Sequence, residues 1–534
     1  MILAIPMSRL LLPSDLGLNP DIFPSFREGQ EDLSTQLALT SARFPLLNSP
    51  CGTGKSLIYF TSALMFDLRL LILTPQKALQ DQLMHDFGPD AGGPLVDVRG
   101  QSNYSCPNFR NCEVGAANEC PLRRLNPSEP HRCENLKAID RARDSKYVVT
   151  NNSFWMTQGR AQSTPSESGP PPGIGKFDLI VIDEGHAAPD KLADFCTLSI
   201  LTKEVESLLE VSPPDTSSLP VWSQWARVQY PRISALLKDA DSPRSRMRLK
   251  AIERDLVELS GISSDRETQW IYQYSRPDDL HTFTPVWASP YAERLLFQGA
   301  GKVLLTSATL LPNIGEYLGI PTAESEYIDV ASTFPPENRP LIYCPSGVKL
   351  SYKSTESDYR ILAAKYDEVI DLWSVYNGLY HTQSHALTEK LYSLSRNKNR
   401  LIVYEKGDAA GAIALLKDGK KKGMIVMGPG LKEGFDLSGD AARFQLVAKM
   451  PFINQSDPVI KARCESNPNY FMDQCSVQLT QTVGRITRSR SDWGWSYTCD
   501  GAFPWVWKEG RFAKSFRDAI RWENGRIPGP PKGR

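Results

Sequence analysis

Seven short apolar runs recur along the chain and set its pattern of hydrophobic and polar positions. Each run is bounded by polar or turn residues, and amphipathic stretches separate most of them. Runs that are apolar on both faces and alternate with helices predict parallel strands covered on both sides. The runs lie at 69–74, 146–150, 178–183, 302–306, 400–404, 423–427 and 444–448. They fall into two groups, so the sequence predicts an α/β fold with two parallel-sheet domains.

Two inserts interrupt the first group of runs. The first, at about residues 100–135, is rich in cysteine, and the second covers about residues 190–297. Within the second insert, four apolar residues repeat at helical spacing with charged residues between them. They are Leu249, Ile252, Leu256 and Leu259. A helix that buries one stripe has this pattern, so the second insert is expected to be mainly helical.

Composition changes this picture little. A chain of 534 residues suits several domains, and a hydrophobic fraction of 41% with a charged fraction of 23% is ordinary for a soluble protein. The net charge is zero, which leaves room for a local basic stripe that binds nucleic acid. The apolar start lacks the basic residues of a signal peptide, and no 18 apolar residues run together. We expect a soluble, cytoplasmic protein without a membrane partner.

Residues 49–56 read SPCGTGKS and precede a helix-like run. Glycines let a backbone wrap around phosphates, and a helix N-terminus adds free N–H groups. In such a loop Lys55 would reach the β- and γ-phosphates of ATP and Ser56 would hold Mg²⁺. Ser49 replaces the first glycine of the strict motif, so a plain glycine turn before a helix is the alternative. The candidate nucleotide-binding residues are Gly52, Thr53, Gly54, Lys55 and Ser56.

A carboxylate pair, Asp183 and Glu184, ends the buried run at 178–183. Acidic residues at the carboxyl end of a parallel strand lie in the crevice where α/β proteins bind ligands. Asp183 can position Mg²⁺, and Glu184 can orient and deprotonate an attacking water. These few groups suffice for phosphoryl transfer, which needs mainly positioning and charge neutralisation. A solvated acidic loop is the alternative.

The motifs around this pair resemble those of superfamily 2 helicases. Asp183-Glu184-Gly185-His186 resembles the DEAH box, with glycine in place of alanine and His186 as its last catalytic member. Phe26–Gln30 is similar to the segment whose glutamine reads adenine. Other resemblances are motif Ia at 71–83, motif III at 304–310, and motifs V and VI of the XPD and DinG helicases at 428–440 and 481–494. The resemblance implies two RecA-like P-loop motor domains.

The motif VI segment fixes Gln481, Gly484, Arg485 and Arg488 together. Arginines one helical turn apart project on one face of a helix. The resemblance implies that Gln481 and both arginines are catalytic, and that the arginines enter the nucleotide cleft from the second domain as fingers. A surface basic helix is the alternative.

Four cysteines fall within the first insert with the spacing C-x5-C-x7-C-x12-C. They are Cys106, Cys112, Cys120 and Cys133. A zinc knuckle usually offers close C-x2-C pairs, whereas four thiolates at wide gaps can hold a [4Fe–4S] cluster. The XPD and DinG helicases carry their cluster at this place between motif Ia and the DEAH-like box. Zinc, with His131 as a substitute ligand, and free thiols remain the alternatives.

The resemblance also implies a domain division. Motor domain 1 would comprise residues 1–99, 136–189 and 298–330, interrupted by an Fe–S insert at 100–135 and an arch-like insert at 190–297. Motor domain 2 would comprise residues 331–534.

The function that follows is an ATP-dependent DNA helicase that moves 5′→3′ on single-stranded DNA and unwinds forked duplex, with ATP, Mg²⁺ and a [4Fe–4S] cluster. Polarity rests on the resemblance alone. The candidate strand-binding residues, which resemble family positions, are Asn151, Asn152, Thr382 and Ser384. An RNA or RNA–DNA hybrid helicase, or a non-unwinding subunit that uses ATP as a switch, are the alternatives.

Overall fold

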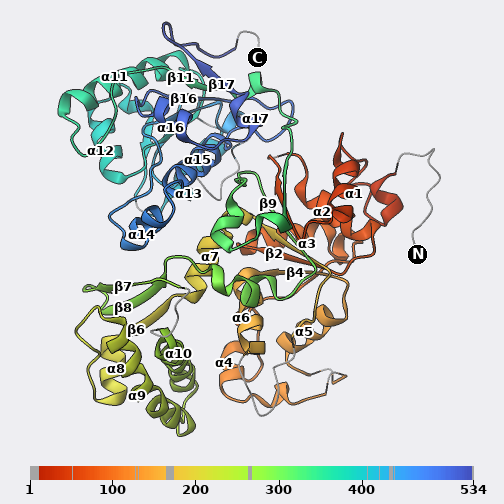
Figure 1. Ribbon diagram of the computed structural model, residues 1–534. Helices are drawn as coiled ribbons and strands as arrows, with labels where there is room; N and C mark the ends of the chain where they lie inside the picture. The colour runs from red at the N-terminus through yellow and green to blue at the C-terminus, as the bar shows by residue number, and fades with distance from the viewer. Residues whose placement is uncertain are drawn as a thin grey trace.

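A computed structural model of the chain describes residues 11–531, apart from residues 51, 127, 130, 164–172, 263–267, 406, 420, 432–436 and 438. In that part of the chain, the strands form two seven-stranded sheets and one three-stranded sheet. The described strand pairs of both large sheets are parallel. The predicted α/β fold with two RecA-like parallel-sheet domains is therefore confirmed. Figure 1 shows the second sheet domain above the first, with both inserts below.

The first sheet is buried on both faces, which explains its continuous apolar runs. Its order is β10 (Ser325–Asp329), β1 (Phe44–Asn48), β9 (Lys302–Ser307), β5 (Leu179–Asp183), β2 (Leu70–Thr74), β4 (Tyr147–Asn151), β3 (Val96–Asp97). Alternate residues of a strand point to opposite faces. On β2, Leu71 and Leu73 accordingly join one hydrophobic cluster, and Leu70 and Ile72 join another.

The helices of the first domain cover both faces of this sheet. They are α1 (Gln30–Leu39), α2 (Lys55–Met65), α3 (Lys77–Phe87), α6 (Asn152–Ser163) and α7 (Ala188–Cys196). Strands β1, β9 and β5 are neighbours in the sheet and end at Asn48, Ser307 and Asp183. The segments that carry the phosphate loop, motif III and the carboxylate pair therefore leave the sheet at one edge.

The second sheet is built in the same way. Its order is β13 (Leu401–Val403), β14 (Ile425–Gly428), β12 (Gly378–His381), β15 (Phe444–Val447), β16 (Trp495–Thr498), β11 (Leu341–Tyr343), β17 (Ile520–Trp522). Its helices are α11 (Glu356–Leu372), α12 (His385–Leu394), α13 (Ala409–Lys417), α14 (Pro458–Ser466), α15 (Tyr470–Val483), α16 (Phe503–Glu509) and α17 (Lys514–Arg517). The central part of the motif V segment, residues 432–436, lies outside the described residues.

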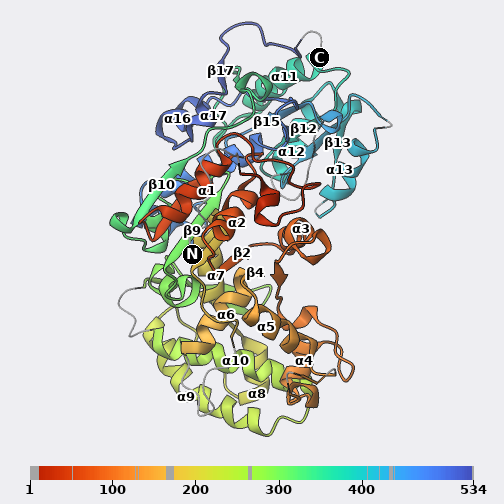
Figure 2. The ribbon, with the colours of Figure 1, turned by 90° about the vertical axis from the view of Figure 1, so that its right-hand side faces the viewer.

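The two inserts lie on the side of the first domain that faces away from the second (Figure 2). The cysteine-rich insert contains α4 (Cys112–Ala117) and α5 (Glu134–Asp144). The larger insert contains β6 (Leu198–Leu201), α8 (Thr202–Leu209), α9 (Leu219–Lys238), α10 (Pro243–Gly261), β7 (Trp270–Ser275) and β8 (Leu280–Pro285).

The larger insert has a hydrophobic cluster of its own, centred on the fully buried Trp222. The predicted stripe on α10 is buried as expected. The antiparallel sheet β6–β8–β7 is an addition that the sequence analysis does not predict. The burial of β8 alternates residue by residue, which is the pattern of a strand with one face on a core.

Candidate active site

The phosphate loop joins the end of β1 to the start of α2 at the carboxyl edge of the first sheet. Gly52 and Gly54 have φ of +83° and +76°, a region that residues with side chains rarely occupy. Gly54 is also the N-cap of α2, and Lys55 and Ser56 lie in the first turn of that helix. The loop therefore leads into the unpaired N–H groups of a helix N-terminus, which is a phosphate-binding arrangement. Cys51 lies outside the described residues.

Side chains on both sides of the loop hold its backbone. Gln30 Nε2 donates to the carbonyl of Thr53 at 2.6 Å, and Arg27 Nη1 donates to the carbonyl of Gly52. Gln30 Oε1 accepts from the Arg27 amide at 2.7 Å. The Ser49 hydroxyl, which stands where the strict motif has glycine, is 2.6 Å from Thr53 Oγ1. Gln30 thus braces the phosphate loop through Nε2 and is itself held by the Arg27 amide through Oε1, and its expected contact with adenine stays a prediction.

The carboxylate pair forms a small hydrogen-bonded group with motif III. Ser307 Oγ, at the end of β9, donates to Glu184 Oε2 at 3.1 Å and is 2.7 Å from His186 Nδ1. The backbone of Glu184 is left-handed, with φ of +51°, a conformation that costs free energy for a residue with a side chain and often occurs at functional sites. Asp183 precedes it and is 8% exposed. Ser307 was not among the predicted site residues, although it lies in the motif III segment.

The glycine of this box has a structural reason. A Cβ atom on Gly185 would lie 3.2 Å from Leu305 Cβ and 3.3 Å from the Thr306 amide nitrogen. These approaches are closer than ordinary van der Waals contact, so the turn after Glu184 packs against β9 more closely than an alanine allows without movement. The departure from the alanine of the DEAH box therefore fits the local packing.

The surroundings shift the pKa values of the two carboxylates in opposite directions. Burial, and then the charge of Glu184, raises the pKa of Asp183 above its ordinary value. Burial alone would also raise the pKa of Glu184, but the hydrogen bond with His186 and the charge of Lys55 outweigh it and lower that pKa. Glu184 is therefore ionised at neutral pH and able to accept a proton. Lys55 also lowers the pKa of Asp183, which places its ammonium within electrostatic reach of both carboxylates.

The second domain reaches this group through α15. Gln481 Nε2 is 2.7 Å from His186 Nε2. On the other side of the ring, His186 Nδ1 is 2.7 Å from Ser307 Oγ and 3.3 Å from Glu184 Oε2, so the imidazole lies between Gln481 and the carboxylate. Gln481, which the sequence predicts to be a catalytic residue, thus lies in contact with the DEAH-like box.

The arrangement of the two arginines differs from the expectation. Helix α15 ends at Val483, and Gly484 is its C-cap. Arg485 and Arg488 lie in the turn after the helix, so helical spacing does not place them on one face. A glycine commonly follows the last residue of a helix, so Gly484 was the sequence feature that could have predicted this helix end. Asp492 Oδ2 accepts from the Arg488 amide at 3.1 Å and shapes the turn.

A buried aspartate binds α15 to the first domain. Asp473 is 1% exposed, and its Oδ2 accepts from Tyr317 at 2.5 Å, from Asn313 at 2.7 Å and from Arg511 at 3.1 Å. Tyr317 and Asn313 follow motif III in the first domain, whereas Asp473 and Arg511 belong to the second. A buried carboxylate needs such partners, so this contact fixes α15 against the segment after motif III.

A second polar contact lies beside it. Arg463 Nη1 donates to Asp190 at 2.5 Å and to the Tyr470 hydroxyl at 3.0 Å. Its guanidinium lies over the rings of Trp287 and Tyr470, 5.1 and 5.7 Å from their centroids. Asp190 is on α7, directly after the DEAH-like box. The sequence analysis missed Arg463 and Asp473 because a pairing of such distant residues leaves no local motif.

The four cysteines of the first insert lie together as two close pairs. The Cys106 and Cys120 Sγ atoms are 3.9 Å apart, and those of Cys112 and Cys133 are 3.7 Å apart. Cys106, Cys112 and Cys133 line one cavity of about 310 Å³, together with His131. None of the four forms a disulfide bond. Among the described residues, no three His, Cys, Asp or Glu side chains are arranged to hold one metal ion.

Burial shapes the chemistry of these thiols. Cys112, Cys120 and Cys133 are each at most 4% exposed. Burial raises the pKa of Cys112, so the free thiol is protonated at neutral pH, and metal ligation requires its deprotonation. Three thiols on one cavity, with the Cys120 sulfur 3.9 Å from that of Cys106, are a donor set that fits a Cys₄-bound iron–sulfur cluster.

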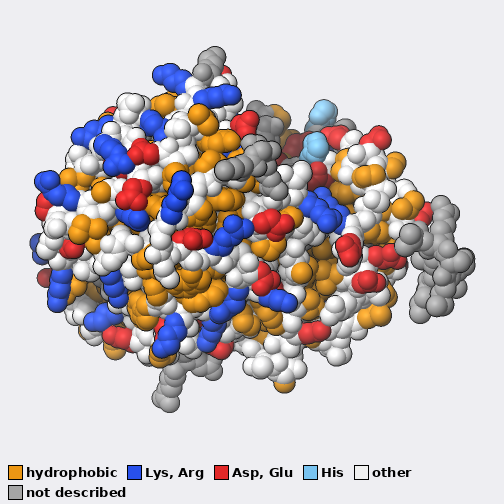
Figure 3. Space-filling view, turned by 90° about the horizontal axis from the view of Figure 1, so that it is seen from above, with side chains coloured by type: hydrophobic (Ala, Val, Ile, Leu, Met, Phe, Trp, Pro, Cys, Tyr) orange, Lys and Arg blue, Asp and Glu red, His pale blue; other side chains and the backbone are white. Residues whose placement is uncertain are grey.

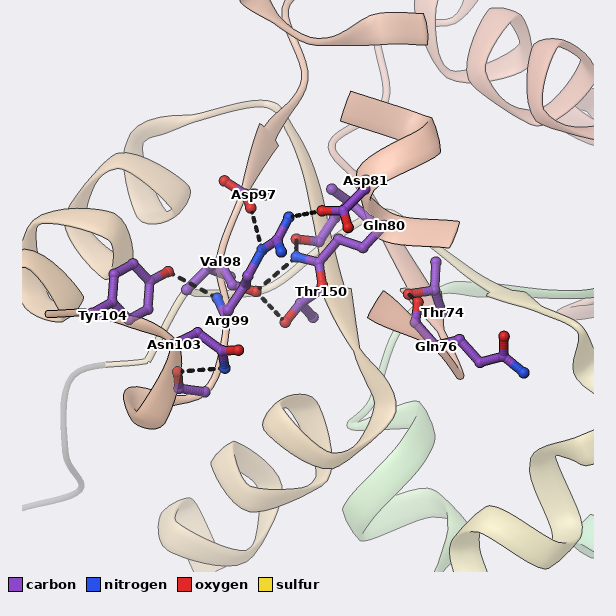
Figure 4. Close-up of polar contacts among 12 residues, drawn as sticks. Thr74, Gln76, Gln80, Asp81, Asp97, Val98, Arg99, Asn103, Tyr104 and Thr150 are labelled. Carbon is purple, nitrogen blue, oxygen red and sulfur yellow. Dashed lines mark hydrogen bonds and ion pairs between the residues drawn. The ribbon is translucent and has the colours of Figure 1, made fainter. Parts of the chain in front are cut away.

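A polar network connects this insert to the motor (Figure 4). Arg99 Nη2 donates to Asp81 on α3 at 2.6 Å, and its Nε donates to Asp97 at 2.7 Å. The Arg99 amide donates to the Tyr104 hydroxyl at 2.9 Å. The carbonyl of Tyr104 in turn accepts from the Cys112 amide at 2.9 Å. The motif Ia helix and the cysteine insert are thus held to one another through two residues.

Of the predicted strand-binding residues, three use their polar groups within the fold or bury them. Asn151 Oδ1 accepts from the Phe154 amide at 2.9 Å, and Asn152 is 5% exposed. Thr382 is fully buried, and its hydroxyl is 2.6 Å from that of Thr388. Ser384 is exposed and caps α12. Direct contact of these side chains with a strand stays a prediction, and it requires Asn151 and Thr382 to give up these contacts.

Thr382 and Ser384 do line a groove of about 760 Å³ on the second domain. Lys390 and Lys449 also line it, as does the ring pair Phe452 and Phe471. These two rings stack with centroids 5.2 Å apart. Figure 3 looks onto the end of the molecule that the second domain forms, and it shows Lys and Arg side chains spread over that domain with hydrophobic side chains between them. Acidic side chains lie among them in the same view, so the basic groups of the groove are Lys449 and Lys390, the latter paired with Glu356.

Two parallel-sheet domains, with a phosphate loop and carboxylate pair on one and a motif VI segment reaching them from the other, define a two-domain P-loop nucleotide hydrolase of the RecA-like motor class. Comparison with known proteins narrows this class. A family model described as "Type III restriction enzyme, res subunit" matches residues 24–215, and one described as "Helicase C-terminal domain" matches residues 370–519.

Curated relatives and solved structures agree with these models. The ATP-dependent DNA helicase YoaA of Escherichia coli is 24% identical, and the match covers 89% of this chain and 92% of that one. The ATP-dependent DNA helicase DinG of Photobacterium profundum is 27% identical over 43% of this chain and 34% of its own. The fold matches that of an XPD helicase with a TM-score of 0.61 at 14% identity, covering 93% of this chain and 99% of that structure. Xpd4 of S. tokodaii gives 0.57 at 16% identity, covering 93% and 100%. These matches make the chain similar to the XPD/DinG-like helicases of superfamily 2.

Within the described residues, no helix combines the length and the apolar character that crossing a bilayer requires.

Proposed function

We propose that this protein is an ATP-dependent DNA helicase that translocates 5′→3′ on single-stranded DNA and unwinds forked duplex. The observation that carries the proposal is the 2.7 Å contact between Gln481 and His186. It joins the DEAH-like box of the first domain to the motif VI segment of the second. A movement of one domain against the other would therefore break or form a contact of the hydrolysis site. The names of its relatives, which are ATP-dependent DNA helicases, support DNA as the track.

The first domain supplies the groups for hydrolysis. Lys55 and the N-terminal amides of α2 would neutralise the phosphates, and Ser56 and Asp183 would hold the Mg²⁺ that accompanies ATP. Glu184 accepts a proton from the attacking water, and His186 and Ser307 keep its carboxylate in place. Its lowered pKa keeps it ionised for this role at neutral pH.

The second domain completes the site. Arg485 and Arg488 follow directly on Gln481 in the chain, in the turn that the Gln481 contact holds at the first domain. As fingers they would stabilise the charge that develops on the transferred phosphoryl group, an effect worth about 10³–10⁵ in rate. Turnover would then require the two domains to be in contact.

The cysteine insert would hold a [4Fe–4S] cluster through Cys106, Cys112, Cys120 and Cys133. Such a cluster, when bound, cross-links the chain segments that ligate it. The contacts of Arg99 and Tyr104 would transmit this rigidity to the motif Ia helix. The role we propose is therefore structural.

The track would pass the groove of the second domain. Proteins that bind single strands without sequence preference combine basic side chains for the phosphates with aromatic rings for the bases. Lys390 and Lys449 provide the first, and Phe452 and Phe471 the second. These residues supplement Ser384 as strand contacts.

Strand displacement on 5′-tailed and 3′-tailed duplexes tests the proposal. We expect ATP-dependent unwinding of the 5′-tailed DNA only. Unwinding of the 3′-tailed DNA would contradict the polarity, and stronger ATPase stimulation by RNA than by DNA would indicate an RNA or hybrid helicase. ATP hydrolysis and strand binding without displacement of any duplex would indicate a non-unwinding ATP-switched subunit.

The cluster has its own test. Protein purified without oxygen should be brown and contain iron and sulfide, and Cys133→Ser should remove both. Cys196→Ser, a change at a buried cysteine outside the cysteine-rich insert, should leave the iron and sulfide in place. A colourless protein with stoichiometric zinc would favour zinc, and one with no metal would favour free thiols.

A further inference from the structure

The two large sheets are joined by a single covalent connection, residues 330–340, which we call the linker. It leaves the first sheet at the end of β10 and enters the second at the start of β11. Asp329, just before it, accepts from Asn48 Nδ2 at 2.8 Å, and the Val330 amide donates to the Asn48 carbonyl at 2.9 Å. Asn48 is the last residue of β1, next to the phosphate loop. The linker therefore starts at the edge of the sheet where the nucleotide site lies.

Phe334 of the linker packs on the phosphate loop itself. A Cβ atom on Gly52 would overlap Cζ and Cε1 of the Phe334 ring. The ring edge thus lies against the α-carbon of Gly52, and Phe334 is 5% exposed. A phosphate loop that changes shape around a nucleotide must move this ring or move along it.

The other end of the linker contacts the segment after α15 that carries Arg485 and Arg488, which we call the arginine turn. Asn338 Nδ2 donates to the Arg490 carbonyl at 3.2 Å, and the Asn338 carbonyl accepts from the Gly494 amide at 2.9 Å. These partners belong to the segment that follows Arg485 and Arg488, and Asn338 is 5% exposed. The position of Asn338 therefore helps to fix the turn on which both arginines lie.

The linker is stiff between these two contacts. It reads FPPENRP from Phe334 to Pro340, and each proline fixes its own φ. Residues Pro336–Asn338 form one 3₁₀ turn. Arg339 closes it, because its Nε donates to the Phe334 carbonyl at 3.1 Å while its Nη1 donates to the Ser515 carbonyl at 2.9 Å. A displacement at Phe334 is thus passed on to Asn338.

From this arrangement we infer that the linker mechanically couples the phosphate loop to the arginine turn. Phe334 and Asn338 are its two positioning residues. Phe334 holds the loop in the shape that receives ATP, and Asn338 holds the turn that acts on the bound nucleotide. The inference rests on the proposed ATP hydrolysis, and it adds a regulatory connection that does not pass through Gln481 and His186.

Steady-state ATP hydrolysis by the full chain, with saturating single-stranded DNA, tests the coupling. Phe334→Ala should raise KM for ATP about tenfold with little change in kcat, because the loss of a well-packed contact of about 1.4 kcal/mol corresponds to tenfold in binding. Phe334→Leu, which retains apolar volume, should restore most of the affinity. Asn338→Ala should lower kcat several-fold and leave KM near its original value.

The double variant decides whether the two residues act together. Independent sites give multiplicative effects on kcat/KM, whereas coupled sites deviate from the product by about threefold or more. Phe177→Ala is the matched control: Phe177 is 6% exposed and precedes β5 at the opposite edge of the sheet. It should lower the thermal stability without raising KM.

The outcomes distinguish a failure of the proposed function from a failure of the linker coupling. A wild-type chain that hydrolyses no ATP would refute the proposed function. A wild-type chain that hydrolyses ATP, with Phe334→Ala leaving KM and the affinity for a fluorescent ATP analogue unchanged, would refute the role of Phe334. Multiplicative effects in the double variant, or an equal rise of KM in Phe177→Ala, would refute the coupling through the linker.

Discussion

Gln481 in the second domain and His186 in the first face each other across the nucleotide site, with Nε2 atoms 2.7 Å apart. The other ring nitrogen of His186 contacts Ser307, which donates to Glu184. One continuous set of hydrogen bonds therefore extends from the motif VI helix to the proposed general base. Loss of domain contact would release the histidine, and with it the orientation of the carboxylate.

Replacing Gln481 tests this connection. A neutral hydrogen bond contributes about 0.5–1.5 kcal/mol, so Gln481→Ala should lower kcat for ATP roughly two- to tenfold with little change in KM. Gln474→Ala, earlier on the same helix, is the control. Unchanged turnover in Gln481→Ala would show that the contact with His186 does not serve catalysis.

Lys55 should be required for hydrolysis but not for strand binding. Lys55→Ala removes the charge that neutralises the phosphates and supports both carboxylates, so ATPase activity should fall to background. Affinity for single-stranded DNA, measured by fluorescence anisotropy without nucleotide, should stay within about twofold, because the proposed groove lies on the other domain. Lys176→Ala is an exposed control at the opposite edge of the sheet. Retained turnover in Lys55→Ala would rule out the phosphate-loop assignment.

The pH dependence should report on Asp183. Burial and the charge of Glu184 raise its pKa to about 6, whereas an ordinary aspartate has a pKa of about 3.9. Asp183 therefore takes up a proton at a higher pH than an ordinary aspartate does. The proton competes with Mg²⁺ for the same oxygens, and the Mg²⁺ concentration needed for half-maximal ATPase activity should rise as the pH falls from about 8 to about 6. Glu184, with its lowered pKa, stays ionised over this range.

Excess Mg²⁺ at the lower pH should therefore restore the rate. If the rate at the lower pH stays depressed at every Mg²⁺ concentration, protonation of another catalytic group must limit turnover instead.

Arg99 should keep the cysteine insert attached to the motif Ia helix. Arg99→Ala removes the ion pairs with Asp81 and Asp97, and at a partly exposed site the loss should be about 1–2 kcal/mol. Amide hydrogen exchange within residues 100–135 should accelerate about 5- to 30-fold. Arg110→Ala, at an exposed position of the same insert, should leave the exchange rates unchanged. Equal protection in both variants would mean that the insert is held by other contacts.

The sequence was sufficient for the features that short-range patterns encode. The strands β2 (Leu70–Thr74) and β5 (Leu179–Asp183) are mostly apolar at successive positions because both faces of their sheet are covered, and the stripe on α10 follows helical spacing. The phosphate loop and the DEAH-like box were predictable because glycines and carboxylates at fixed offsets perform the chemistry. Their convergence at one edge follows from the parallel strands.

Other features depend on tertiary contacts and carry no such pattern. Asp473 accepts hydrogen bonds from Asn313 and Tyr317, which lie 160 and 156 residues before it in the chain. No local sequence pattern at either end indicates this pairing. The helix face expected for Arg485 and Arg488 was wrong because Gly484 ends α15. The sheet of β7 and β8 escaped prediction because helical periodicity dominated the rest of its insert.

The separate core of the larger insert has an evolutionary consequence. Because residues around Trp222 pack mainly on one another, a substitution there is absorbed within the insert and leaves the packing of the motor sheet unchanged. Drift in that segment can therefore run ahead of drift in the motor. A change in the size or surface of the insert is therefore compatible with an unchanged motor, whereas the segments around His186 and Gln481 depend on one another.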